Sequence, residues 1–366
     1  MNDLEQARQQ INRVDREIAL LFTQRMEAAR TIAAYKKAHA LPIFDRNREQ
    51  ALIEQNCLCI EDPQLRSFYI PFQKKVMEVS RAYQHHLLSG TRVAYSGVEG
   101  AFAYIAAGRI FPDGELVSCP DFESAYQAVE NGACDCAVLP LENSYAGEVG
   151  QVMDMAFRGS LYVSGVYSLK VAQNLLGLPG TAPDRIRRVL SHPQALSQCR
   201  DYIHAHGYEA VTAVNTAVAA KEVAKSGDPT LAAIASRETA KLYGLAVLDH
   251  DINESDQNST RFAVFTRLPA ETKAGDTFLL CFTVKHQAGA LAEAIQIIGR
   301  YGYNMTSLRS RPMKETAFHY YFYIEAEGTL ETDRGQEMLE ELAQRCERLK
   351  IVGSYAEETE LKDALL

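Results

Sequence analysis

The chain has little that would place it in or beside a membrane. Its 366 residues contain no apolar run that approaches the ~20 residues of a membrane span. The opening stretch, Met1 to Gln6, is polar and has no apolar core of a signal peptide. The net charge of −9 argues against nucleic acid or an anionic membrane as a general partner. We therefore expect a cytoplasmic protein that holds anionic ligands with local groups of cations.

The cysteines do not form a metal-binding pattern. Eight of them are spread from Cys57 to Cys346, which is typical of reduced thiols in a cytoplasm. The pairs Cys57/Cys59 and Cys134/Cys136 have the spacing C-x-C, with no second pair at zinc spacing. We expect buried thiols and no metal site.

The hydrophobic pattern changes twice along the chain, as expected for about two to three domains at this length. Helical periodicity covers 1–88, strands and helices alternate over 91–267, and the order βαββαβ fits 277–356. We expect Ser89-Gly90 and the polar stretch 268–276 to be linkers between these segments. The turn 96–100 lacks the full glycine fingerprint of a dinucleotide site, so nucleotide binding is not expected.

The first segment predicts three helices. Apolar residues recur at spacings of three and four from Leu4 to Ile32, but Arg25 occupies one position of this stripe. Asp45 would cap a second helix, and Asp62-Pro63 would open a third that runs to about Leu88. A guanidinium on a packed stripe is costly unless an anion pairs with it. That anion is either the carboxylate of an interhelical salt bridge or a bound ligand.

The number of polar groups on these faces favours a dianionic ligand. The residues from Leu4 to Lys36, 45–49 and Ser80-x-x-x-Gln84 together resemble the all-helical chorismate mutase family. The resemblance implies a site shared between two chains, in which the substrate carboxylates, ether oxygen and ring hydroxyl are each held. Its members would be Arg8 of the partner chain and Arg25 on the carboxylates with Arg48 alongside, Lys36 and Gln84 on the ether oxygen, Asp45 and Glu49 on the hydroxyl, and Ser80 in the lining.

In the middle segment, polar residues gather where predicted strands end. Glu142 and Asn143 follow the strand 137–141, Ser191 follows 189–190, and Gln198 lies in the next helix. Each alone is an ordinary cap or turn, but open α/β sheets bind ligands at the carboxyl ends of their strands. The strand 258–265 returns after this stretch, so we expect two lobes joined by two crossings, with a cleft between them.

The motifs of this segment resemble prephenate dehydratase, most specifically at 258–262. The resemblance implies a two-lobed fold like that of periplasmic binding proteins, with Thr260 as proton donor for loss of the ring hydroxyl. The substrate-binding residues would be Glu142, Asn143, Ser191, Gln198, Arg261 and Phe262. Side-chain alternation along a strand places Thr260 and Phe262 on one face and Arg261 on the other. Ala101 and Ala103 stand where this family often has Thr or Ser.

The last segment predicts a ferredoxin-like domain. Its aromatic strand 318–324 needs cover, which favours pairing with a second copy. Residues 288–291 and 309–312 resemble the amino-acid-sensing ACT domain, which implies phenylalanine binding and inhibition through Gly289, Ala290, Leu291, Ser310 and Arg311. Arg309 replaces the usual glutamate of the second motif. The charged stretch 357–366 has no assigned role.

Together these resemblances predict a bifunctional enzyme that converts chorismate to prephenate and then to phenylpyruvate, inhibited by phenylalanine. No cofactor is expected, and the partners are the two substrates, the effector and further copies of the chain in a dimer or tetramer. One alternative is a dehydratase that prefers arogenate, whose amine needs an acidic partner. Another is a non-catalytic two-lobed regulator that binds a metabolite, against which the intact Thr260 and the cations of the helical segment argue.

Overall fold

The structure, a computed structural model, describes residues 3–39, 41–255, 257–270, 277–313, 319–356 and 358–362. The chain divides into two compact units. The first comprises Met1–Arg92 with Asp113–Glu115 and Gly132–Cys134, and the second comprises the remainder. Over the described residues, no helix combines the length and the apolar character needed to cross a membrane.

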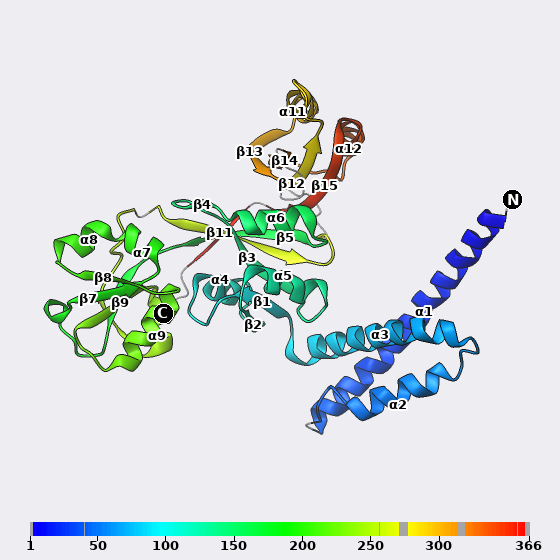
Figure 1. Cartoon of the computed structure of the whole chain (residues 1–366), viewed down its shortest axis with the longest axis horizontal. Helices are drawn as coiled ribbons and strands as arrows, with labels where there is room; N and C mark the ends of the chain where they lie inside the picture. The colour runs from blue at the N-terminus through cyan, green and yellow to red at the C-terminus, as the bar shows by residue number, and fades with distance from the viewer. Residues whose placement is uncertain are drawn as a thin grey trace. The chain divides into compact units, whose positions relative to one another are not determined.

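The first unit consists mainly of the helices α1 (Asp3–Ala38), α2 (Arg46–Cys57) and α3 (Pro63–Ser89), as Figure 1 shows. Asp45 caps α2 and accepts a hydrogen bond from the backbone N–H of Arg48, while Asp62 caps α3 ahead of Pro63. Both α1 and α2 pack on α3. The predicted helices and both caps are confirmed.

Only the second half of α1 contributes buried residues to this unit: Met26, Ala29 and Ala33. In the first half the apolar stripe is open to solvent in the single chain, with Leu4 58% and Ile11 59% exposed. An apolar stripe of this length requires a covering surface.

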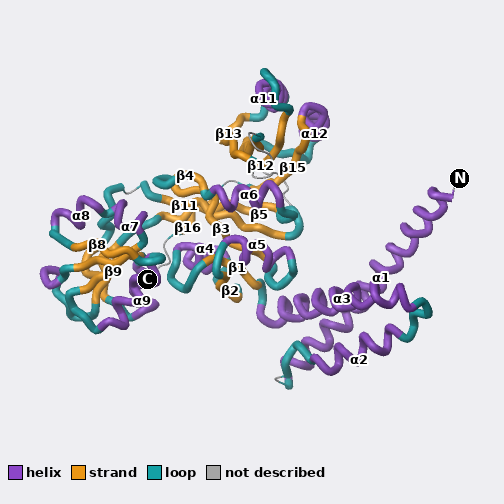
Figure 2. The backbone as a smooth tube through the Cα atoms, viewed as in Figure 1, coloured by secondary structure: helices purple, strands orange, loops and turns teal. Residues whose placement is uncertain are grey.

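The second unit begins with an α/β lobe around the larger of two sheets (Figure 2). Its strands are β1 (Arg92–Ser96), β2 (Glu115–Cys119), β3 (Cys136–Asn143), β4 (Gly147–Glu148), β5 (Tyr162–Lys170) and β11 (Ser259–Thr266). Its helices are α4 (Phe102–Ile110), α5 (Phe122–Glu130) and α6 (Gly150–Arg158). In this lobe the strand order is β5-β11-β3-β1-β2, with β4 paired to β3.

A second lobe is built on a separate five-stranded sheet with the order β10-β6-β9-β7-β8. Its strands are β6 (Asn174–Gly177), β7 (Arg188–Ser191), β8 (Glu209–Thr212), β9 (Leu231–Ala235) and β10 (Ala246–Asp249). Its helices are η1 (Pro183–Arg185), α7 (Pro193–Gln198), α8 (Arg200–Ala205), α9 (Thr216–Ser226) and α10 (Arg237–Tyr243). The chain leaves the first lobe after β5 and returns before β11, and the two crossings are hydrogen-bonded to each other, since the Val171 N–H donates to the Asn258 carbonyl at 2.8 Å. The predicted two-lobed arrangement with two crossings is confirmed.

The C-terminal part follows the predicted order βαββαβ. Its elements are β12 (Thr277–Val284), α11 (Ala290–Arg300), β13 (Asn304–Pro312), β14 (Tyr320–Glu327), α12 (Asp333–Arg345) and β15 (Cys346–Tyr355). The strand order is β13-β14-β12-β15, and α11 and α12 contact each other over the sheet (Figure 1). A common core joins Phe278, Phe282, Ile298, Ile324 and Leu342. Phe318 of the predicted aromatic strand lies outside the described residues.

One boundary prediction is wrong. The helical pattern predicts a helix from Asp333 to Leu349, whereas α12 ends at Arg345 and the chain continues directly as β15. Residues 346–349 pair with β12, where Val284 lies opposite Cys346 and Phe282 opposite Leu349. The end of such a helix depends on the strand with which the following residues pair, and the local hydrophobic pattern gives no information about that strand.

The C-terminal sheet continues into the sheet of the first lobe. Gly353 of β15 lies opposite Val163 of β5, and β16 (Thr359–Leu361) pairs in parallel with Tyr167 to Leu169 farther along the same strand. A Cβ atom on Gly353 would lie 2.1 Å from the Val163 carbonyl oxygen. Only glycine therefore permits this approach of the two strands.

Replacing Gly353 by alanine should separate β15 from β5 and lower the free energy of unfolding by about 1–3 kcal/mol, the usual cost of overpacking. Thermal or urea unfolding of the full chain measures this change. Gly299→Ala is a matched control, because a Cβ there meets no atom within 4 Å. If the two variants are equally stable, the close contact at Gly353 does not stabilise the protein.

Candidate active sites

The three helices of the first unit line a cavity of ≈ 200 Å³. It gathers all but one of the predicted mutase residues. Its polar lining comprises Arg25 and Lys36 of α1, Asp45, Arg48 and Glu49 at the start of α2, and Ser80, Arg81 and Gln84 of α3. The exception is Arg8, which lies about 25 Å from Arg25 along α1 at 1.5 Å per residue. Arg8 of this chain therefore does not reach the cavity.

Two cations of this cavity are held by backbone carbonyls. Arg25 donates to the Val76 carbonyl at 3.4 Å, and Lys36 donates to the Ile43 carbonyl at 2.5 Å. Partial burial lowers the pKa of Arg25, and the nearby Glu49 carboxylate opposes this effect. Because an arginine pKa starts far above neutrality, the side chain remains a cation.

On α3, Ser80 and Gln84 are both buried in the wall of the cavity. The Gln84 amide donates to the Ser80 carbonyl at 3.3 Å, and its oxygen has no hydrogen-bond partner among the described residues. A buried amide with an unused polar atom is available to a ligand. Rotation of this amide would present its N–H group to an oxygen in the cavity.

Arg81 is a member of this site that the sequence did not single out. Its guanidinium forms an ion pair with Glu49 and lies over the Phe44 ring, 5.1 Å from the centroid. A lone arginine beside a helical stripe looks like part of a solvated face, so periodicity gave no reason to select it. The contact fixes the Glu49 carboxylate, which the resemblance assigns to the ring hydroxyl.

The second cavity, of ≈ 350 Å³, lies between the two lobes of the second unit. From the first lobe, Thr260, Phe262 and Asn143 line it, together with the Ala101–Ala103 turn. From the second lobe come Gln198 and residues that were not selected as site residues: His192, Gln194, Asn215 and Thr216. The predicted alternation along β11 is confirmed, since Thr260 and Phe262 share this face.

Asn143 organises the side chains around Thr260. Its amide nitrogen donates to the Thr260 hydroxyl oxygen at 2.9 Å and to the Asn258 side-chain oxygen at 3.0 Å. Its oxygen accepts from the backbone N–H groups of Tyr145 and Ala146 at 3.1 and 2.9 Å. Because the hydroxyl oxygen of Thr260 accepts this hydrogen bond, its own proton is available for donation into the cleft.

The cleft offers helix N-termini to an anion. Phe102 begins α4 and Thr216 begins α9, and both residues line the cavity. The first N–H groups of a helix are unpaired within the helix, and the helix dipole favours negative charge at this end. The lining residues of the described cleft include no lysine, arginine, aspartate or glutamate. Its polar lining consists of amides, hydroxyls and His192, beside the two helix N-termini.

Three predicted substrate-binding residues lie elsewhere. Ser191 is fully buried behind the cleft, where its hydroxyl donates to the Ile234 carbonyl at 2.6 Å. Glu142 and Arg261 are absent from the cleft lining and lie 3.6 Å apart in an ion pair. They are neighbours of Asn143 and Thr260 in β3 and β11, and side chains one residue apart point to opposite faces of a sheet.

Arg261 binds carboxylates of the C-terminal part instead. Its two terminal nitrogens donate to the two oxygens of Glu325, each at 3.1 Å, and its Nε donates to Glu358 at 2.8 Å. Burial by itself would lower the pKa of Arg261, and the Glu325 and Glu358 carboxylates more than offset this effect and raise it. The side chain is therefore a permanent cation between two elements that are distant in sequence.

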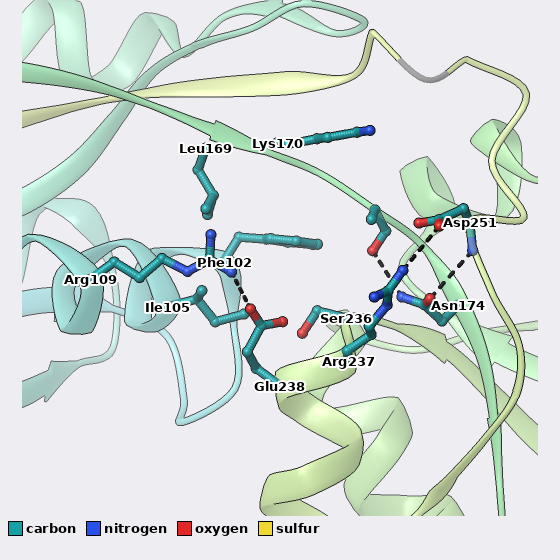
Figure 3. A pocket seen from close by; sticks show the side chains of 11 residues that line it. Phe102, Ile105, Arg109, Leu169, Lys170, Asn174, Ser236, Arg237, Glu238 and Asp251 are labelled. Atoms are coloured by element: carbon teal, nitrogen blue, oxygen red, sulfur yellow. Dashed lines mark hydrogen bonds and ion pairs between the residues drawn. The ribbon is translucent and has the colours of Figure 1, made fainter. Parts of the chain in front are cut away.

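A further pocket, of ≈ 290 Å³, lies beside the crossings between the lobes (Figure 3). Arg109 of α4 points to Glu238 of α10 and forms an ion pair with it. On the second lobe, Arg237 pairs with Asp251 at 3.0 Å. The Arg109–Glu238 contact connects the two lobes on this side.

The residues predicted to bind phenylalanine lie on two elements of the C-terminal part. Gly289, in a left-handed conformation with φ 86°, precedes α11, which begins at Ala290 and contains Leu291. Ser310 and Arg311 lie on β13. The Arg311 guanidinium is engaged within the chain, since it donates to Asp154 at 3.0 Å and to Glu148 at 2.7 Å. Arg309 forms an ion pair with Glu142.

Comparisons with known proteins agree with this division. Residues 93–270 match the family model described as prephenate dehydratase, and residues 7–85 match chorismate mutase type II. A bifunctional chorismate mutase/prephenate dehydratase of Enterobacter agglomerans is 32% identical over 376 residues, covering 98% of this chain and 97% of that protein. Arogenate dehydratase/prephenate dehydratase 2, chloroplastic, of Arabidopsis thaliana is 34% identical and covers 74% of each chain.

Solved structures resemble the second unit. Prephenate dehydratase from Arthrobacter aurescens in complex with L-Phe has a TM-score of 0.67 at 27% identity, and covers 72% of this chain and 89% of that one. GqqA, described as a novel type of quorum quenching acylase, has a TM-score of 0.67 at 31% identity and covers 72% and 97%.

The fold and the two cavities thus belong to a class of multidomain enzymes that act on small anionic substrates. The chain is a member of the bifunctional chorismate mutase/prephenate dehydratase family. This confirms the resemblances of the first segment to chorismate mutase and of the middle segment to prephenate dehydratase.

Proposed function

We propose that the helical cavity rearranges chorismate to prephenate and that the cleft at Thr260 converts prephenate to phenylpyruvate. The observation that carries this proposal is the separation of two differently equipped cavities, one lined by cations and one by amides and a hydroxyl. The corresponding domains are 1–88 for the mutase, 91–267 for the dehydratase and 277–356 for regulation. The matched ranges 7–85 and 93–270 support the first two.

The rearrangement is a concerted shift of bonds that needs no nucleophile, base or metal. In the helical cavity, Arg25 and Arg48 hold the two carboxylates in the reactive conformation, and Lys36 and Gln84 donate to the ether oxygen as charge develops on it. Asp45 and Glu49 position the ring hydroxyl, and Ser80 completes the wall. Arg81 holds Glu49 in place through its ion pair.

The cavity requires a second copy of the chain for its last cation. Arg8 lies on the exposed half of α1, where the apolar stripe of the same helix is also uncovered. A homo-oligomer, a dimer or a tetramer, covers the stripe and brings Arg8 of one chain to the cavity of the other.

The dehydratase step breaks two bonds of prephenate. The ring carboxylate leaves as carbon dioxide, its bonding electrons enter the ring, and the hydroxyl departs with the proton of Thr260 as water. One proton from solvent restores the hydroxyl of Thr260, so the step consumes one proton overall. Asn143 holds the Thr260 hydroxyl in place, and Gln198 and Phe262 position the ring. Glu142, Ser191 and Arg261 support the cleft from outside it.

Prephenate is favoured over arogenate as the substrate. Arogenate carries an ammonium group, which needs a carboxylate partner. The lining of the described cleft has no aspartate or glutamate. Some plant relatives are named arogenate dehydratases. Turnover of arogenate should therefore be measured beside turnover of prephenate.

The C-terminal part acts as an ACT domain that binds phenylalanine and inhibits the dehydratase. Its βαββαβ order and the L-Phe complex of the Arthrobacter aurescens neighbour support this role. Gly289, Ala290, Leu291 and Ser310 remain the proposed contacts. Arg311 helps to form the phenylalanine site only through its place in β13, because its guanidinium is already bound to Glu148 and Asp154.

Thr260→Ala should lower phenylpyruvate formation from prephenate by about 10²–10⁴-fold, the usual contribution of a general acid. Chorismate consumption should be unchanged, because it occurs in the other cavity. Thr260→Ser keeps the hydroxyl and should retain most of the activity. Wild-type dehydratase turnover in Thr260→Ala would contradict the role of this residue.

Arg25→Ala should have the opposite effect and lower mutase turnover by about 10²–10³-fold, the scale of losing one preorganised electrostatic contact. Dehydratase turnover of added prephenate should remain. Arg16→Ala, on the exposed surface of the same helix, serves as the control. Undiminished mutase activity in Arg25→Ala would show that the arginine only pairs with neighbouring helices.

Titration calorimetry of the full-length protein with phenylalanine should give saturable binding. Absence of any phenylalanine binding would leave the C-terminal part with a role in assembly only.

A further inference from the structure

Arg261 connects three chain segments on the face of β11 that lies away from the cleft. Glu325 of β14, Glu358 before β16 and Glu142 of β3 all lie within ion-pair distance of its guanidinium. Two of these carboxylates belong to the C-terminal part of the chain. The next residue toward the start of the strand is Thr260, whose hydroxyl faces the cleft.

The contact between Arg261 and Glu325 is not a loose surface ion pair. The Glu325 residue is only 5% exposed, and both of its carboxylate oxygens accept from Arg261. Its Oε1 also accepts from the Tyr323 hydroxyl at 2.9 Å. A buried carboxylate is tolerated only while its cation remains in place, so the position of Arg261 is closely tied to that of β14.

At the same point, the pairing of β11 with β3 is irregular, while its pairing with β5 is regular from Ser259 to Val264. Thr260 pairs with Asn143 and Arg261 with Glu142, but Phe262 pairs with Pro140, so the register between β11 and β3 shifts between Arg261 and Phe262. Such an irregularity interrupts the ladder and changes the local twist, and it often directs a side chain into an active site. The ion pairs of Arg261 therefore act on β11 at the point where its ladder to β3 is interrupted, next to Thr260.

The segment 358–362 adds a second attachment. Glu358 binds the Nε of Arg261, and β16 then continues in parallel along β5. At its end, the carbonyls of Leu361 and Lys362 accept from Arg109 at 3.3 and 3.1 Å. Arg109 is also the residue that pairs with Glu238 across the lobes (Figure 3). One short segment thus contacts both the strand of Thr260 and the arginine that joins the lobes.

We propose that Arg261 is a positioning residue through which Glu325 and Glu358 set the orientation of Thr260 in the cleft. The C-terminal part and the segment 358–362 control dehydratase turnover through this contact. The inference rests on the proposed role of Thr260 as proton donor, and it assigns a function to a charged stretch that had none.

The test measures dehydratase kcat and KM with prephenate, and mutase turnover with chorismate, on full-length Glu358→Gln and Glu325→Gln. Glu360→Gln is the matched control, because Glu360 is an exposed carboxylate of the same segment. Glu358→Asp keeps the negative charge and tests whether a carboxylate at this position restores dehydratase kcat. The thermal unfolding midpoint of each variant monitors the fold, which matters most for the buried Glu325.

Glu358→Gln should lower dehydratase kcat by about ten- to a hundredfold, the scale of a misplacement of about 1 Å. The KM should stay within about twofold, since the cleft residues that bind the substrate are untouched. Glu358→Asp should recover part of the loss, while Glu360→Gln and all mutase rates should match wild type. Glu325→Gln should show the same split between kcat and KM.

Wild-type kcat in both glutamine variants would overturn the inference, and so would an equal fall in dehydratase and mutase rates, which indicates general destabilisation. A raised KM with unchanged kcat would also overturn it, because the carboxylates would then affect binding only. These outcomes are separate from the test of Thr260 itself, since all the variants retain its hydroxyl.

Discussion

The buried ion pair between Arg261 and Glu325 is the constraint on which the second unit depends. It joins β14 of the C-terminal part to β11, with Glu325 buried and Arg261 partly buried. The same strand presents Thr260 and Phe262 to the cleft. A single strand therefore carries the proposed chemistry on one face and the attachment of the C-terminal part on the other. Breaking such a pair costs far more than breaking an exposed one, so the two faces cannot move independently.

The two cavities differ in the groups that they offer to an anionic substrate. The net charge of −9 gives no general attraction for anionic substrates, so each site needs its own donors. The helical cavity is lined by the cations Arg25, Lys36 and Arg48. The cleft is lined by the first residues of α4 and α9 and by no lysine or arginine. Cations suit a reaction that develops charge on an ether oxygen.

Much of this architecture could be predicted from the sequence, because periodicity and caps are local. Asp45 and Asp62 marked helix starts that the structure contains, and alternation placed Thr260 and Arg261 on opposite faces. The predictions that failed concern residues whose contacts are with partners distant in sequence. The end of α12 is decided by pairing with β12, and Glu142 is drawn to Arg261 and Arg309 instead of a ligand. The strand β16 has no pattern of its own and forms because β5 offers a free edge.

A time course tests most directly whether one chain contains two separate sites that act in succession. The purified full-length protein is given chorismate, and prephenate and phenylpyruvate are followed together. The account predicts that chorismate falls, that prephenate appears first, and that phenylpyruvate then accumulates to match the chorismate consumed. Accumulation of prephenate with no phenylpyruvate would contradict it.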